Sequence, residues 1–466
     1  MNLAKRILLA SSMLVAVIAW CVAGVNEPAP KVKAKGERTY MFRIHLRDKT
    51  GCGYSIANPL QFLSPKAMER RNRQHLGVDS TDLPVSKAYE QIIEQLGCKV
   101  VSRSKWNNTV VAQTENSSFG NAVKELPFVT ESRLVWTSPD SVEAERPRPK
   151  YHQELTLHDT VNITRYGATE GQLRMLGAQK LHAEGFTGKG MTIAVMDAGF
   201  LNADLIPALR DINLVGYADL VCPQSKSIFA EMEHGEQVLS VIAVNVPHVY
   251  VGTAPDASFW LLRCEDEDTE QPVEEDWWAA AAEYADSAGV DVINSSLGFH
   301  EYDNQQDSYR YWQQDGKTAL ISRTASMIAG KGMVLVNSCG NDGMSSWKKI
   351  NFPADATDIL AVGAVTSERC NAGFSSLGPS ADGRVKPDVM AQGSPTAVVT
   401  ERGTVSSSVG TSFAAPLITG LVACLWQKYP EKTALEIMQM VRESGDNASH
   451  PDNVFGYGVP DFSRIR

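Results

Sequence analysis

Four polar side chains in the second half of the chain could together carry out acyl transfer. They are Asp197, His234, Asn341 and Ser412. A hydroxyl nucleophile needs a base that takes its proton, a carboxylate that holds and stabilises the imidazolium, and hydrogen-bond donors for the tetrahedral oxyanion. Each of these parts is present once, in the order carboxylate, imidazole, amide and hydroxyl.

Each of these residues taken singly has an ordinary structural interpretation. An aspartate after a strand often caps a turn, a single histidine is usually structural, and an asparagine between glycines commonly lies in a turn. Ser412 is less ordinary, because Pro416 four residues later has no N–H to donate to the carbonyl of Ser412. The first helical turn is therefore irregular, and it leaves the hydroxyl near unpaired amides and the positive end of the helix dipole.

Asp197 alone would also suit a phosphotransferase or hydrolase that uses an aspartate as nucleophile. Such a site usually has a second acidic residue two places on, where this chain has Gly199. A nucleotide-binding loop is excluded, because Gly188 and Gly190 precede the strand and no GxGxxG or GxxxxGK[ST] follows it. An aspartate nucleophile also leaves the surroundings of Ser412 unexplained.

The elements that must position these residues follow the pattern of a parallel sheet. Short runs rich in Val, Ile and Leu alternate with helical stretches, at 191–197, 258–265, 290–298, 333–341 and 358–366. Nearly continuous apolar runs indicate strands that are buried on both faces. We therefore predict an α/β fold with a doubly wound, mostly parallel sheet flanked by helices. Ligands bind such sheets at the carboxyl ends of the strands, where Asp197 and Asn341 stand.

The remaining sequence predicts four segments. Residues 1–24 place two basic residues before an apolar run too short to span a bilayer, which indicates a cleavable signal peptide. Residues 38–138 alternate helical and strand patterns, so we expect a small α+β domain. Residues 139–166 lose this periodicity and gather Pro, Arg and Glu, as in an exposed connector where proteases cut. The sheet domain would occupy residues 167–466.

Composition restricts the partners and cofactors. A net charge of -10 without a dense Lys/Arg run argues against a nucleic-acid partner. None of the eight cysteines forms a CxxC pair or a zinc-like cluster, and without Cys21 an odd number remains, which cannot all pair. The chemistry above requires no cofactor. A structural calcium ion is compatible with the chain, but no EF-hand pattern supports it.

The motifs around the four residues resemble those of the subtilisin-like serine proteases. They are AVMDAGF, HGEQVLS, NSCGN and GTSFAAP. The resemblance implies that Ser412 is the nucleophile, His234 the general base and then acid, and Asp197 the orienting carboxylate. Asn341 and the backbone N–H of Ser412 would form the oxyanion hole. The residues that the resemblance implies for substrate binding are Ser296, Leu297, Gly298, Ser338, Cys339, Gly340 and Asn351.

Two positions depart from the pattern of the family. Glu236 and Gln237 stand where the family commonly has Thr and His, so a carboxylate close to His234 could change the titration of that imidazole. Asn351 stands where the family often has glycine, which would narrow the pocket or make it more polar.

The resemblance implies a secreted serine endopeptidase that cuts polypeptides through an acyl-enzyme and is made as a self-processing zymogen. Its N-terminal domain resembles the propeptides of these proteases, which occupy the cleft, and the precursor would be cut between about residues 135 and 167. We expect export to the medium, the periplasm or the cell surface without a transmembrane helix in the mature protein, with a lipid anchor at Cys21 as the alternative. The alternative function is a non-catalytic, peptide-binding member of the same fold.

Overall fold

The computed structural model describes residues 32–33, 38–139, 141–142, 164–223, 225 and 227–465. The predicted signal peptide at 1–24 and most of the predicted connector at 139–166 lie outside these residues. The chain divides into two compact units, Met1–Arg38 with Ser138–Arg148, and Thr39–Thr137 with Pro149–Arg466. In the first unit, β1 (Val32–Lys33) and β6 (Ser141–Val142) pair antiparallel. The larger sheets, the helices and the candidate site lie in the second unit.

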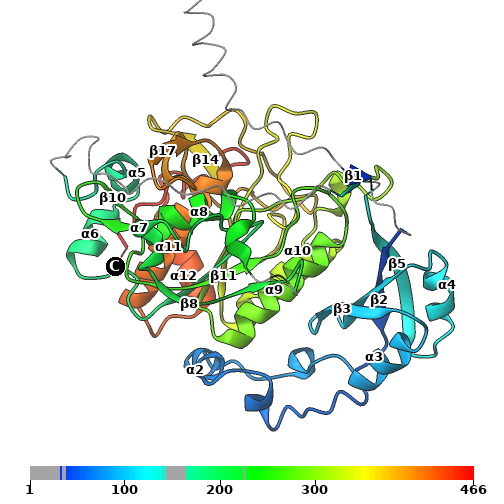
Figure 1. The fold of residues 1–466 in the computed structure, drawn as a ribbon. Helices are drawn as coiled ribbons and strands as arrows, with labels where there is room; N and C mark the ends of the chain where they lie inside the picture. The colour runs from blue at the N-terminus through cyan, green and yellow to red at the C-terminus, as the bar shows by residue number, and fades with distance from the viewer. Residues whose placement is uncertain are drawn as a thin grey trace, which may run out of the picture. The chain divides into compact units, whose positions relative to one another are not determined.

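A seven-stranded sheet forms the centre of the second unit (Figure 1). Its order is β15-β14-β13-β12-β7-β11-β8, and every neighbouring pair is parallel. The predicted doubly wound parallel sheet is thus confirmed, and the sequence patterns missed only its two edge strands, β8 and β15. The strands are β7 (Thr192–Asp197), β8 (Asn213–Asp219), β11 (Ser258–Arg263), β12 (Val292–Ser295), β13 (Val334–Ser338), β14 (Leu360–Thr366) and β15 (Val389–Ser394).

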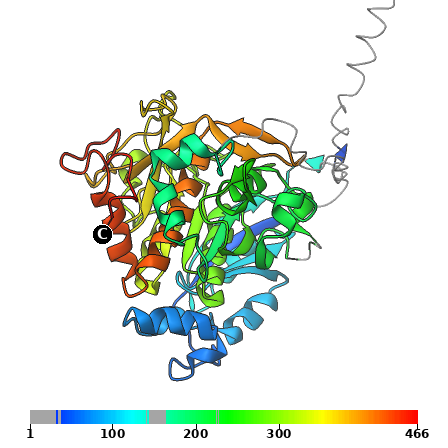
Figure 2. The ribbon, with the colours of Figure 1, turned by 90° about the vertical axis from the view of Figure 1, so that its left-hand side faces the viewer.

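Helices cover both faces of this sheet (Figures 1 and 2). Ile193 and Val195 of β7 pack in one apolar core with α8 (His234–Ala243) and α11 (Thr411–Lys428). Ala194 and Met196 pack in a second core with the two helices of the other face, α9 (Glu274–Ala288) and α10 (Leu320–Met327). Because successive side chains of a strand point to opposite faces, a strand between two helical layers must be apolar throughout.

The smaller elements of this domain surround the sheet. The short helices and the last helix are α5 (Glu170–Met175), α6 (Ala178–Ala183), α7 (Pro207–Arg210) and α12 (Ala434–Glu443). Two antiparallel pairs add β9 (Asn245–Val246) with β10 (Tyr250–Val251) and β16 (Thr396–Val399) with β17 (Val405–Ser408). The hairpin of β16 and β17 lies against α8, where Val399 N donates to Ser240 Oγ at 2.9 Å.

The N-terminal domain is a four-stranded antiparallel sheet of order β3-β4-β2-β5, as the predicted α+β arrangement required. Its helices α3 and α4 pack with Phe42 and Ile44 in a separate core. Met41, Val111 and Val135 face the other way and join the core that contains α9. The elements are β2 (Tyr40–Leu46), α2 (Pro65–Arg73), α3 (Lys87–Glu94), β3 (Lys99–Ser104), β4 (Thr109–Thr114), α4 (Phe119–Lys124) and β5 (Val129–Thr137).

The sequence SPKAMERRNRQHLG, residues 64–77, has a serine cap, a proline and a final glycine that favour a helix over its whole length, and α2 begins as this pattern indicates but ends earlier. Ser64 Oγ accepts from Ala67 N at 3.1 Å, and Pro65 is the first helical residue. The helix stops at Arg73 instead of continuing to the glycine at 77, because His75 adopts a left-handed φ of 58°. Gln74, at the end of the helix, donates to Gly332 O and accepts from Ala434 N. The end of α2 is therefore held by the loop at Gly332 and by the first residue of α12, both in the sheet domain.

Buried ion pairs join the N-terminal domain to α9. Arg71 lies 2.9 Å from both Asp82 and Asp286, and Lys105 lies 3.1 Å from Asp286. Arg43 of β2 makes a second group with Asp276, through Nε contacts of 2.8 Å to both carboxylate oxygens. Burial alone would raise the pKa of Asp286, but Lys105, Arg70 and Arg71 outweigh burial and lower the pKa. Asp286 of α9 is thus stabilised as an anion by basic side chains of the N-terminal domain.

We predict that Asp286→Ala lowers the free energy of unfolding of the full chain by about 3–5 kcal/mol, because buried cations are left without their anion. Urea denaturation followed by fluorescence measures the change. Arg174→Ala is the matched control: it removes an exposed i,i+4 pair with Glu170 and should cost less than about 1 kcal/mol. Equal losses in the two variants would contradict a role for the buried pairs.

Candidate active site

Asp197 and His234 meet at the carboxyl end of β7. Asp197 is fully buried, and its Oδ1 accepts from Ala198 N at 2.9 Å and from His234 Nδ1 at 2.8 Å. Gly235 makes this approach possible, because a Cβ at that position would lie 2.6 Å from the Cβ of Asp197. The donated Nδ1–H fixes the tautomer of His234, so that Nε2 is the ring nitrogen left to accept a proton.

Ser412 lies in the first turn of α11, which Pro416 makes irregular as predicted. The carbonyl of Ser412, which Pro416 cannot pair, accepts instead from Ser296 Oγ at 2.8 Å. The hydroxyl of Ser412 donates to Ser296 O at 3.2 Å, and no hydrogen bond to His234 is found among the described residues. Ser296, the residue after β12, therefore holds the start of α11 through two hydrogen bonds with Ser412.

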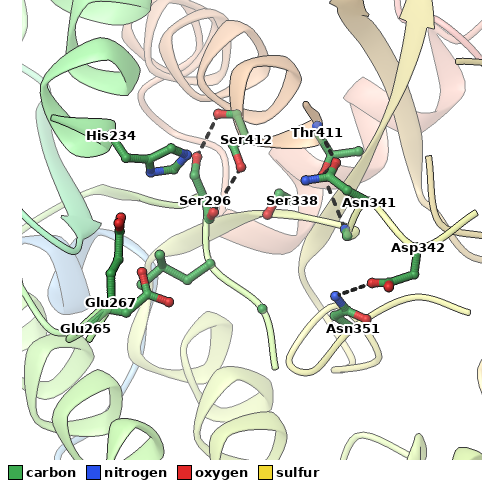
Figure 3. Close-up of a pocket in the computed structure, with 13 residues that line it drawn as sticks. His234, Glu265, Glu267, Ser296, Ser338, Asn341, Asp342, Asn351, Thr411 and Ser412 are labelled. Carbon is green, nitrogen blue, oxygen red and sulfur yellow. Dashed lines mark hydrogen bonds between the residues drawn. The ribbon is translucent and has the colours of Figure 1, made fainter. Parts of the chain in front are cut away.

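Asn341 is oriented by the residue before Ser412. Its Oδ1 accepts from Thr411 N at 2.9 Å and from Thr411 Oγ1 at 3.0 Å. These two bonds assign the amide, because both donors must face its oxygen. The Nδ2 group is therefore left to face the pocket (Figure 3). It can donate a hydrogen bond to an oxyanion that forms beside Ser412.

A pocket of about 360 Å³ brings the predicted residues together (Figure 3). Asp197 lies behind His234 and does not line it. The side chain of Cys339 is turned away and buried, with its Sγ near Ser375 and Ser376. The predicted residues that line the pocket are His234, Ser296, Leu297, Gly298, Ser338, Gly340, Asn341, Asn351 and Ser412.

Asn351 closes one end of this pocket. Its Nδ2 donates to Asp342 Oδ2 at 2.9 Å, while its Oδ1 has no partner among the described residues. Gly298 lies opposite, where a Cβ would come within 3.0 Å of the Cβ of Asn351. A side chain of a bound peptide that enters here meets an amide and a carboxylate at close range. This end of the pocket is therefore polar.

Three acidic lining residues and the threonine that orients Asn341, Thr411, were not predicted from the sequence. Glu265 and Glu267 come from the loop after β11, and Asp342 follows Asn341. A signal was available for the first two, since the acidic run EDEDTE begins at Glu265, the last residue of a predicted strand. Strand β11 is the neighbour of β7, so the residues that follow it come out beside Asp197.

The carboxylates around His234 determine its titration. Burial alone would lower the pKa of His234, but Asp197, with Glu265 and Glu267 further away, outweighs burial and raises the pKa to about 9. Glu236 is not among the main groups that shift the pKa of this imidazole. The sequence suggested that Glu236 would change the titration of His234, but Asp197, Glu265 and Glu267 are the carboxylates that do so.

Glu236 itself is a buried carboxyl without a partner. It is fully buried in α8, and neither of its oxygens has a hydrogen-bond partner among the described residues. Burial, with Glu401 and Glu233 nearby, raises the pKa of Glu236 well above its usual range. Burial therefore favours the protonated, uncharged form of this carboxyl.

Comparison with known proteins places this arrangement in a class of hydrolases. The model of the subtilase family of peptidases matches residues 188–458, and a model of the peptidase S8 propeptide domain of Bacteroidota matches residues 41–153. The chain therefore belongs to the subtilase family, the serine-type peptidases related to subtilisin, and carries a propeptide domain. The resemblance stated from the motifs is confirmed.

Individual relatives agree with this assignment. Subtilisin NAT of Bacillus subtilis subsp. natto is 27% identical over 386 residues, which cover 82% of this chain and 87% of that protein. Subtilisin DY of Bacillus licheniformis is 29% identical over 279 residues, or 59% of this chain and 90% of that one. The solved structure of the MycP3 protease from the type VII (ESX-3) secretion system has the same fold, with a TM-score of 0.51 and 20% identity over 66% of this chain and 90% of that chain.

The described residues contain neither a membrane-spanning helix nor a cluster of metal ligands. None of the helices there is both long enough and apolar enough to cross a bilayer. No group of three or more His, Cys, Asp or Glu residues is arranged there to hold a metal ion. The seven described cysteines are free, and four of them are buried.

We predict that the imidazole of His234 titrates with a pKa of about 9. Nitrogen-15 NMR of histidine-labelled protein measures this value, in a Ser412→Ala background that prevents self-digestion. Asp197→Asn should lower the pKa, because it removes the anion that favours the imidazolium. A native pKa at or below 6.5, or one that does not respond to Asp197→Asn, would show that the carboxylates do not control His234.

We predict that Glu236→Gln stabilises the fold at pH 8 and changes little at pH 4. The folded-state pKa of Glu236 lies above the unfolded value of about 4.5, so the unfolded chain loses the proton first and the native fold loses stability as pH rises. Glutamine has a similar shape and no such loss. We expect a gain on the order of 1 kcal/mol or more at pH 8 by urea denaturation. A less stable variant at pH 8 would argue against a neutral carboxyl.

Proposed function

We propose that the protein is a serine endopeptidase that hydrolyses peptide bonds through Asp197, His234 and Ser412. The observation that carries the proposal is the 2.8 Å contact between His234 Nδ1 and Asp197 Oδ1 in a pocket that also contains the hydroxyl of Ser412. A base held in one tautomer beside a hydroxyl on a helix N-terminus is suited to nucleophilic attack on a carbonyl.

The first chemical step forms the tetrahedral intermediate that precedes the acyl-enzyme. The hydroxyl of Ser412 leaves Ser296 O and turns to Nε2 of His234, which takes its proton as the oxygen attacks the carbonyl carbon. Such bonds are often long or absent before substrate binds. Asp197 stabilises the imidazolium, and the pKa of about 9 means that the neutral base prevails only above that pH. The amide of Asn341 and the backbone N–H of Ser412 donate to the oxyanion.

The second step releases the product. His234 gives its proton to the leaving amine, and a water then attacks the acyl carbon while His234 again acts as base. Ser296, Leu297 and Gly298 would pair with the main chain of the substrate as an added strand. Ser338, Cys339 and Gly340, with Asn351 at the base, would form the pocket for the residue before the cut.

We further propose that the chain is an exported zymogen that processes itself. Its parts would be a signal peptide at 1–24, a propeptide at 38–138, a connector at 139–166 and the catalytic domain at 167–466. Three hydrogen bonds support the approach of the propeptide to the substrate side: Gln271 exchanges two with Thr137 at 2.9 and 3.1 Å, and Val273 N donates to Val135 O at 3.1 Å. The last propeptide strand thus ends beside the segment that follows Glu265 and Glu267.

Expression of the full chain and of Ser412→Ala tests the proposal. The native precursor, 50.8 kDa before any cleavage, should be cut in the connector, hydrolyse peptides and react with a fluorophosphonate. Ser412→Ala should do none of these, since it lacks the nucleophile. Asn341→Ala should retain labelling and lose about a hundred- to a thousand-fold in turnover, the usual cost of one oxyanion donor. Labelling that survives in Ser412→Ala, or a native protein that binds peptides without cutting them, would refute the assignment.

A further inference from the structure

One wall of the pocket is acidic. Glu265 and Glu267 lie below His234, on one side of the segment that begins at Ser296, and Asn341 and Asn351 lie on the other side (Figure 3). Asp342 also lies on this second side, where its Oδ2 accepts from Asn351 Nδ2 at 2.9 Å, so the first side carries two carboxylates and the second side carries one. The proposed catalytic mechanism uses neither Glu265 nor Glu267.

Glu265 has no cation of its own within the part of the chain that the structure describes. The nearest basic residue along the strand, Arg263, is engaged elsewhere, with Asp219 at 3.2 Å and Ala198 O at 2.9 Å. Burial, together with Asp197, Glu270 and Glu267, raises the pKa of Glu265 well above its usual range, and His234 opposes this only in part. A cationic guest would relieve both effects at Glu265, since it brings a positive charge close to that carboxyl group.

The proposed function determines which substrate side chain reaches this wall, and the inference rests on it. A peptide that lies extended along Ser296 to Gly298 has side chains that alternate between its two faces. When its carbonyl lies between Ser412 and Asn341, the residue before the cut points toward Asn351. The residue before that one must point the opposite way, toward Glu265.

The chain contains a segment that fits this pattern. Within the connector, Arg146, Arg148 and Lys150 occur at every second position, so they would share one face of an extended peptide. The match to the propeptide model ends close by, at residue 153. With Tyr151 as the residue before the cut, Lys150 would face the acidic wall.

We propose that Glu265 and Glu267 select peptides with Lys or Arg at the second residue before the cut, and that the precursor is cut between Tyr151 and His152. The ammonium or guanidinium group forms charge-assisted hydrogen bonds with the carboxylates, which are stronger than bonds between neutral groups. The propeptide is then the first substrate, and other substrates share its basic residue at that position.

A matched pair of fluorogenic peptides tests the selection with the processed form of the full chain. The two differ only at the second residue before the cut, which is Lys in one and Nε-acetyl-lysine in the other. We expect kcat/KM to be at least about tenfold higher for the Lys peptide. A tenfold ratio corresponds to a difference of about 1.4 kcal/mol in transition-state stabilisation. The ratio is independent of the protonation of His234, since the same base serves both peptides.

Glu265→Gln/Glu267→Gln should reduce this ratio to about one, and Glu301→Gln, an exposed carboxylate outside the pocket, should leave the ratio unchanged. A ratio near one in the native protein would overturn the inference without needing the variants. An unchanged ratio in the double variant would overturn it as well. Failure of the native protein to cut either peptide would instead refute the proposed peptidase function.

Intact-mass analysis of the processed protein tests the second half of the proposal. We expect a new N-terminus at His152 and slower processing of Lys150→Gln than of Lys124→Gln, which changes an exposed lysine outside the connector. Any other N-terminus would overturn the assignment of this bond. Processing of Lys150→Gln at the native rate would overturn the requirement for a basic residue there.

Discussion

The hydrogen bond from His234 to Asp197 is the contact on which the rest of the site depends. It requires that β7 end at Asp197 and that α8 begin within reach, which only a glycine at position 235 allows. Parallel strands end at one edge of a sheet, so the segments after β11, β12 and β13 come out beside the same pair. The fold therefore supplies the oxyanion donors and both walls of the cleft at the place where the imidazole is held.

Uncompensated acidity is a second constraint, and the chain meets it in two ways. On α9, the carboxylates of Asp276 and Asp286 are neutralised by basic side chains of the N-terminal domain, which explains why an acidic helix can be buried. In the cleft, Glu265 has no such partner among the described residues and is left to hold a proton or a cationic guest. We infer that basic side chains balance buried carboxyl groups at two places: those of the propeptide domain on α9, and those of the substrate in the cleft.

The sequence predicted the elements whose patterns are purely local. The five central strands have continuous apolar runs, and α2 and α3 begin at Ser64 and Ser86 as their caps require. The edge strands β8 and β15 were missed because their sequences, NLVGYAD and VMAQGS, are interrupted by polar residues and glycine and form no continuous apolar run. The four candidate catalytic residues were predicted because together they supply the four groups that acyl transfer needs. Their geometry, and the acidic wall, depend on which strands are neighbours, and no local pattern specifies that order.

The buried carboxyl groups show the same limit. The position of Glu236 two residues after His234 suggested an effect on the imidazole, but the helix turns Glu236 into the core, where its carboxyl group has no hydrogen-bond partner among the residues that the structure describes. Ion pairs such as Arg71 with Asp286 join residues more than two hundred positions apart, so their spacing in the sequence carries no signal. Long-range contacts of this kind have to be read from the structure.

A crystal structure of the processed enzyme with a peptidyl phosphonate tests the central claim most directly. The account predicts a covalent bond from Ser412 Oγ to phosphorus, a phosphoryl oxygen within hydrogen-bond distance of Asn341 Nδ2 and Ser412 N, and His234 still bonded to Asp197. A phosphonate bound to another residue, or a phosphoryl oxygen directed away from Asn341, would contradict it.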